Sequence, residues 1–157
     1  MKGYLMTSLL LAGIAALASH VEGGHRKLSA PTYYIATRAD YTGDPARIHV
    51  RGASNLPAGA RLSISIYDRV GQGSTLLSDE TVATVDGEGF FEVAVHAAKG
   101  SSFRHNVCDV VFMPRFHQPA SIFEAVGEEG ERLGFPQNPQ AYVHSGEYYL
   151  LDSVHVP

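Results

Sequence analysis

The only cysteine of the chain, Cys108, lies in the stretch HNVCDVVFMP, with His105 and Asp109 close by. A thiol, an imidazole and a carboxylate could together form a nucleophilic centre or part of a metal site. The alternation of the stretch argues against both, because Cys108 shares a wholly apolar strand face with Val110 and Phe112. In a strand, His105 and Asp109 would also lie roughly 13 Å apart, which is too far to ligate one ion. We therefore expect Cys108 to be a buried packing residue, with an intermolecular disulfide as the alternative.

Eight histidines invite a metal hypothesis, and two of them stand out by position. His20 and His25 lie in the segment 19–31, the leader, close to the new amino terminus that cleavage before Ser19 would create. A chain that begins Ser-His-Val could chelate Cu(II) through its terminal amine and the His20 imidazole. A copper-binding or redox protein that uses these leader histidines is therefore one alternative function. The main hypothesis includes no cofactor and no metal.

Sequence patterns typical of hydrolytic enzymes are missing. The chain has no Gly-x-Ser-x-Gly motif of the kind that presents a nucleophilic serine. The glutamates between Glu124 and Glu131 form a run typical of a solvated helix face. The stretch DGEG at 86–89 has too few carboxylates for the six to eight oxygens of a calcium site, and we interpret it as a plain hairpin turn. We expect a protein that is not an enzyme.

The amino-terminal stretch MKGYLMTSLLLAGIAALASH has the features of a signal peptide. One lysine precedes an uncharged apolar run from Leu5 to Ala18, and small residues at 16 and 18 suit cleavage before Ser19. As a helix, the apolar run would span about 21 Å, short of the roughly 30 Å of a bilayer core. Residues 1–18 are therefore expected to be removed. Removal would leave no membrane span and would place the protein in the periplasm or outside the cell.

Apolar and polar residues alternate along most of the remaining chain, which is typical of half-buried β-strands. The clearest example is RLSISIYD, with Leu62, Ile64 and Ile66 on one face. Seven runs of this kind occur, at TYYIATRAD, ARIHVRG, RLSISIYD, TVATV, GFFEVAV, NVCDVVFMP and EYYLLDSVHV. Such spacing predicts an all-β fold, an immunoglobulin-like antiparallel β-sandwich of about seven strands formed by residues 32–157 as a single domain. A closed barrel is the main alternative.

The segment 114–145 lacks strand alternation and is longer than most connections in compact domains. Pro119 suits the start of a short helix over Ala120–Val126, before the last strand. The segment is interpreted in two ways. It could plug the open end of the sandwich with its helix, or it could be a recognition loop that displays Phe116, Phe135 and Tyr142.

Two short stretches resemble known families. NLPAGARLSISIYD resembles a turn-and-strand unit of small exported bacterial β-proteins, including periplasmic lipoproteins described as chaperone-like. RIHVRGASNLP is similar to the opening of C2 domains. The chain lacks the cysteine that anchors lipoproteins, and the calcium-binding aspartates of C2 domains have no counterpart in it. The resemblance therefore implies an exported bacterial β-sandwich and no particular functional residue.

The charge balance limits the classes of partner. With 12 Lys/Arg and 16 Asp/Glu, the chain has a formal net charge of −4, which makes nucleic acid a poor partner. The main hypothesis is an exported, non-enzymatic β-sandwich module that binds a protein or a cell surface, as a monomer or with weak self-association. A further alternative is a structural subunit that assembles by adding residues 19–37 as a strand to a neighbour.

Overall fold

The computed structural model describes residues 32–68, 74–99, 101–103 and 106–156. The expected signal peptide, the leader with His20 and His25, and His105 lie outside these ranges. Within the ranges, no helix is long and apolar enough to cross a membrane.

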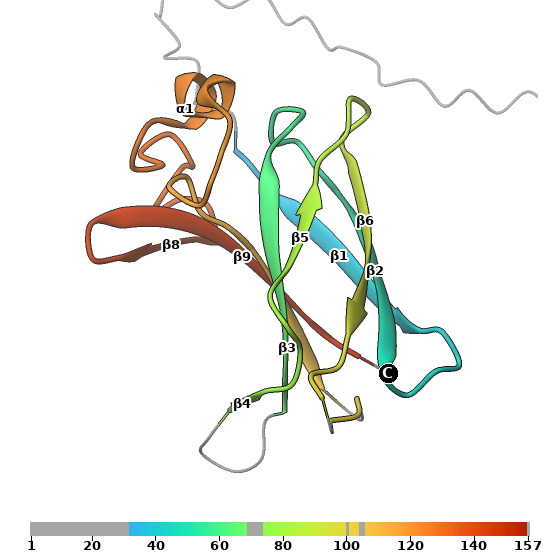
Figure 1. The fold of residues 1–157 in the computed structure, drawn as a ribbon. Helices are drawn as coiled ribbons and strands as arrows, with labels where there is room; N and C mark the ends of the chain where they lie inside the picture. Colours follow the sequence, from blue (N-terminus) through green and yellow to red (C-terminus); the bar gives the residue numbers. More distant parts are fainter. Residues whose placement is uncertain (1–31, 69–73, 100, 104–105, 157) are drawn as a thin grey trace, which may run out of the picture.

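The described ranges form nine strands and one short helix. Their bounds are β1 (Ile35–Tyr41), β2 (Arg47–Ser54), β3 (Arg61–Asp68), β4 (Thr75–Leu76), β5 (Thr81–Thr84), β6 (Phe90–His96), β7 (Val107–Phe112), α1 (Ala120–Val126), β8 (Ala141–His144) and β9 (Glu147–His155). Strands β1, β2 and β6 form sheet A in that order, and β4, β3, β7, β9 and β8 form sheet B, in which β5 also pairs with β3. All of these pairs are antiparallel. The fold is therefore an all-β sandwich of two sheets (Figure 1).

The core lies between the two sheets, where the alternation of the sequence places it. Leu62, Ile64 and Ile66 of β3 are fully buried, as are Cys108 and Phe112 of β7. Burial of a Leu, Ile or Phe side chain contributes about 1.5–3 kcal/mol to stability, so these strand faces hold the sheets together. The predicted inward faces of both strands are confirmed.

Strand number is the first point on which the sequence prediction was wrong. The structure has all seven expected strands and adds β4 and β8, and β8 lies within the segment 114–145 that was expected to lack strands. Four residues are too few for alternation to be visible in the sequence. β8 instead pairs with β9 across a two-residue turn, in which Ser145 and Gly146 have φ of 52° and 85°. Positive φ at both positions is typical of a type I′ turn, which suits the twist of a hairpin.

The turn at 86–89 is the second point of difference. It does not close a hairpin within one sheet, because β5 pairs with β3 in sheet B while β6 pairs with β2 in sheet A. The Asp86 carboxylate accepts hydrogen bonds from the backbone N–H groups of Glu88 and Phe90, at 2.9 and 2.8 Å. These bonds hold the chain in a tight corner from one sheet to the other.

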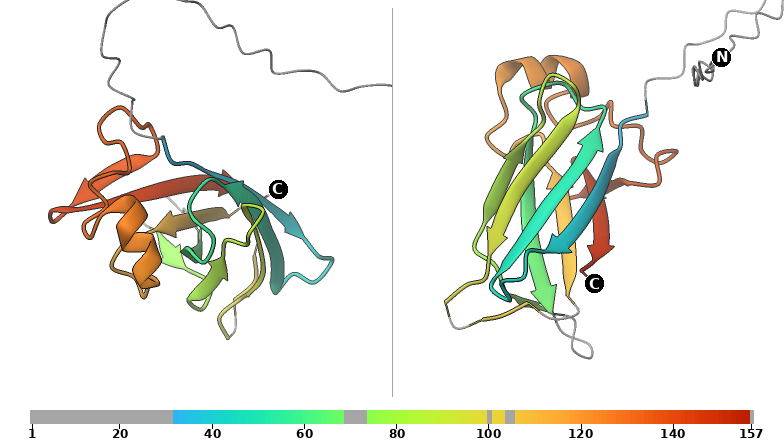
Figure 2. Two further views of the ribbon diagram at one scale, coloured as in Figure 1. Left: turned by 90° about the horizontal axis from the view of Figure 1, so that it is seen from above. Right: turned by 90° about the vertical axis from the view of Figure 1, so that its right-hand side faces the viewer.

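The helix predicted over Ala120–Val126 is present as α1. It begins after Pro119 and ends at Gly127, whose φ of 89° favours glycine. Ile122 and Val126 of α1, and Leu133 after it, are fully buried in the core. Figures 1 and 2 place α1 at one end of the two sheets. The segment 114–145 is therefore an integral part of the sandwich.

The outer edge of β1 is covered over its first residues by side chains from the end of the chain. Ile35 donates its N–H to Oε1 of Gln140 at 2.9 Å, and Nε2 of Gln140 donates to the Ile35 carbonyl at 2.7 Å. Thr37 donates its N–H to Oδ2 of Asp152 at 2.8 Å. An amide side chain thus takes the place of a neighbouring strand at Ile35, which hinders pairing with another chain at this end of the edge.

Candidate functional site

Cys108 has the surroundings of a packing residue. It is a free cysteine, fully buried between the sheets. Burial, with smaller effects from the charges of Asp109 and Asp152, raises the pKa of its thiol from 9.0 to about 12. Since the thiolate is the reactive form, burial and the raised pKa both disfavour reaction of this thiol near neutral pH. The prediction that it is buried is confirmed.

The histidines do not converge on a metal site in the part of the chain that the structure describes. There, no group of three or more His, Cys, Asp or Glu residues could hold an ion. His20 and His25 lie outside that part, so copper binding by the leader stays a prediction.

The three expected recognition residues do not form one surface. Phe135 and Tyr142 are each 43% exposed, whereas Phe116 is half-buried and lies edge-on to a neighbouring histidine ring. Phe135 packs against Tyr148, with ring centroids 5.8 Å apart, and Tyr142 stacks on Tyr149 at 5.6 Å. Tyr148 and Tyr149 are adjacent in β9, so their side chains point to opposite faces of the strand. Aromatic rings therefore cover both faces of the β8–β9 hairpin.

The free edge of this hairpin is the second feature of the surface. Among the described residues, β8 pairs with β9 alone, and Figure 1 shows the hairpin extending beyond the stacked sheets. Val143 lies in the middle of β8 and is 46% exposed. His144 and Glu147 flank the two-residue turn and form a hydrogen-bonded pair. In the next pair, Val143 and Tyr148, the backbone N–H and C=O groups therefore point away from the partner strand of the hairpin. The N–H of Tyr148 accordingly bonds outside the hairpin, to the Glu129 carbonyl at 2.7 Å.

A concave area on the outer face of sheet A is the second candidate site. It has a volume of about 560 Å³ and is lined by Ala36, Thr37, Arg38, Arg51, Gly52, Ala53, Thr84, Asp86, Phe90, Phe91 and Glu92. Strand register explains its shape. Ala36, Ala53 and Phe90 lie opposite one another on the three strands. The two alanines leave a hollow beside the Phe90 ring, which is 54% exposed.

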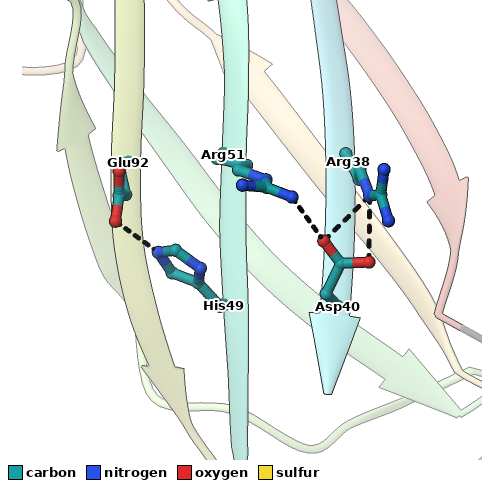
Figure 3. A network of polar contacts seen from close by, with 5 residues as sticks. All are labelled: Arg38, Asp40, His49, Arg51 and Glu92. Atoms are coloured by element: carbon teal, nitrogen blue, oxygen red, sulfur yellow. Dashed lines mark hydrogen bonds and ion pairs between the residues drawn. The ribbon is translucent and has the colours of Figure 1, made fainter. Parts of the chain in front are cut away.

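An ionic network lines one side of this hollow (Figure 3). Nε of Arg38 donates to both carboxylate oxygens of Asp40 at 2.9 Å, and Nη2 of Arg51 donates to Oδ2 at 3.3 Å. The hydrogen bond from Arg38 is the largest effect on Asp40 and holds the pKa of this carboxyl below 3.8. His49 and Glu92 form a separate pair, with Nε2 and Oε1 2.6 Å apart. Asp40 thus stays ionised and orients both guanidinium groups.

Sequence reasoning missed this site for a physical reason. Alternation places Arg51 on the polar side of β2, but it does not reveal which residues of β1 and β6 lie opposite. The register that brings Arg38, Arg51 and Glu92 into one row depends on tertiary pairing. The one sequence signal for this site was that arginines and small residues share the polar side of otherwise regular strands.

Comparison with known proteins gives no relative, since no family model, curated protein sequence or solved structure matches this chain. The side chains and strand edges described above are therefore the basis for inferring a function.

Proposed function

We propose that the protein is an exported, non-enzymatic binding module, and that another protein binds it by adding a strand to β8. One observation carries the proposal. The chain covers the beginning of the β1 edge with Gln140 and Asp152, yet it leaves the edge of β8 open in the described structure, with apolar Val143 exposed at its centre. Soluble proteins usually protect such edges, so an open apolar edge is typical of strand addition.

The immunoglobulin-like topology is part of the proposal, and the strand order supports it. In the constant type of such sandwiches, the first, second, fourth and fifth strands share one sheet, while the third, sixth and seventh form the other. Here β1, β2 and β6 correspond to the first, second and fifth strands, and β3, β7 and β9 to the other sheet. The chain departs from this pattern at the fourth place, because β5 pairs with β3 in sheet B. β8 then extends the second sheet beyond its last strand.

The side chains around β8 suit a partner strand with apolar residues. The outward N–H and C=O of Val143 would form a hydrogen-bonded pair with the added strand. The rings of Tyr142 and Tyr149 lie on one face of the hairpin, and those of Phe135 and Tyr148 on the other. An added strand would contact Tyr142 on one face of β8 and Val143 on the other, at about 0.2–1 kcal/mol for each cross-strand pair.

The test is a selection of random peptides against the mature protein, followed by affinity measurement on two variants at one position. Val143→Pro removes the outward N–H, and proline is tolerated on an edge strand. Val143→Thr keeps that N–H and the preference for strand structure. We expect the selected peptides to lose at least about tenfold in affinity with Val143→Pro and less than about threefold with Val143→Thr.

Equal binding of the selected peptides to Val143→Pro and to the wild type would exclude strand addition at β8. Light scattering on the same proteins covers the case in which the added strand comes from a second copy of the chain. A wild-type dimer that becomes monomeric with Val143→Pro would support the proposal with this partner.

A further inference from the structure

We propose that the concave outer face of sheet A, on a different part of the molecule from β8, is a binding site for an organic carboxylate with an apolar body. Two adjacent rows of residues build it. The first row consists of Ala36, Ala53 and Phe90, and the second consists of Arg38, Arg51 and Glu92. A hollow with an apolar floor, one aromatic wall and two cations at its side has the features of a small-molecule site.

The two arginines retain donors for a ligand after Asp40 is satisfied. A guanidinium carries five N–H donors, and Asp40 is in contact with one nitrogen of Arg38 and one of Arg51. Both side chains are more than half exposed, so the remaining donors are accessible from the hollow. Since Asp40 restrains both groups, less side-chain entropy is lost when a second carboxylate binds between them.

The acidic groups of the same hollow limit the charge of the ligand. The carboxylates of Glu92 and Asp86 line it as well, although Glu92 is paired with His49 and one oxygen of Asp86 accepts hydrogen bonds in its own turn. Two nearby negative charges disfavour a phosphate dianion or a polyanion. A monoanion fits, with its carboxylate at the arginines and its apolar part against Phe90.

The floor of the hollow depends on Gly52. A Cβ at this position would lie 2.4 Å from the Phe91 ring and 2.2 Å from the Ala36 carbonyl oxygen. The absence of a side chain therefore lets Phe91 fill the core directly under β2.

Titration with phenylacetate, monitored by the backbone amide resonances of the protein, tests the inference. Phenylacetamide is the matched uncharged ligand. We expect phenylacetate to bind with a Kd on the order of 1 mM and to shift the amides of Arg38, Arg51 and Phe90. Phenylacetamide should bind at least about tenfold more weakly, and 0.5 M NaCl should weaken phenylacetate binding.

Two variants provide the controls. Arg51→Gln should weaken phenylacetate binding by about tenfold. Arg47→Gln should leave it unchanged, because Arg47 lies on the same face of β2 but does not line the hollow. The natural ligand could be the carboxyl terminus of a peptide chain or a small free acid. A peptide that ends in phenylalanine, with a free or an amidated carboxyl terminus, distinguishes these two sources of the carboxylate. Equal binding of phenylacetate and phenylacetamide, or unchanged binding by Arg51→Gln, would overturn the inference.

Discussion

Cys108 and Asp40 illustrate how position decides the chemistry of a residue. Both have charged neighbours, but Cys108 is sealed between the sheets while Asp40 lies on the outer face of β1. Alternation within a strand was enough to predict burial of the thiol. The partners of Asp40 could not be predicted, because Arg51 lies on another strand and is brought near by register.

The buried thiol makes stability depend on alkaline pH. The pKa of Cys108 is about 12 in the folded chain, against an ordinary value of 9.0. Between these values the unfolded chain releases the proton while the folded chain keeps it, so stability falls as pH rises above about 9. Between pH 8 and pH 10.5, we expect the free energy of unfolding of the wild type to fall by about 2 kcal/mol more than that of Cys108→Ala. Urea denaturation at both pH values measures this difference, and parallel losses would contradict burial of the thiol.

Titration of Asp40 tests the orientation of the two arginines. Because its pKa is lowered in the folded chain, its contribution to stability is present above 3.8 and is lost as pH falls through the lowered value. We expect the carboxyl carbon resonance of Asp40 to titrate below pH 3.8 in the wild type. In Arg38→Gln, the midpoint should move up, since the hydrogen bond from Arg38 is the largest cause of the shift. An unchanged midpoint would mean that the contact does not persist in solution.

Among the elements, α1 could be predicted from the sequence and β8 could not. Pro119 and Gly127 mark the two ends of α1, and both signals act within the chain locally. β8 has neither length nor alternation, and its conformation depends on β9 and on the turn between them. Phe135 and Tyr142 near β8 are exposed, but their distribution over two faces follows from strand pairing and could not be predicted.

Asn138 connects the segment 114–145 to the residues just before β1. Its side chain is buried, and Nδ2 donates to the carbonyls of Tyr33 at 2.6 Å and Leu133 at 2.8 Å. Asn138→Ala should lower the free energy of unfolding by about 2–3 kcal/mol, because two buried acceptors lose their donor. Gln137→Ala changes an exposed neighbour and should alter stability by less than about 0.5 kcal/mol. Chemical denaturation of both variants checks this, and equal stabilities would contradict the role assigned to Asn138.

At the scale of the whole molecule, two sheets share one core to which the segment 114–145 contributes. The all-β architecture could be predicted because period-two alternation directly reflects burial on one strand face. Strand order and the closed and open edges could not, since they depend on contacts between residues far apart in the chain. Gln140 reaches Ile35, for example, across most of the domain sequence.

Removal of residues 116–142, with a short Gly-Ser bridge in their place, should unfold the whole domain. The deletion takes Ile122, Val126 and Leu133 from the core and Gln140 from the edge of β1. At about 1.5–3 kcal/mol for each buried side chain, the loss is comparable with the entire stability of a small domain. Circular dichroism and thermal denaturation measure the outcome. The exposed substitution Glu124→Ala serves as the control, and a cooperative transition in the deletion variant would show that the segment is dispensable.

The most direct test of strand addition at β8 is amide hydrogen exchange at Val143 in the presence of a selected peptide. If the peptide adds a strand to β8, the Val143 amide gains a hydrogen bond, and its exchange should slow by at least about tenfold at saturation. The Val82 amide serves as a reference, because Val82 is similarly exposed and lies on β5, which, like β8, pairs with one neighbour in the described structure but is a different edge of sheet B. Slower exchange at Val143 with no change at Val82 is the predicted result. Saturating peptide with unchanged exchange at Val143 would contradict the account.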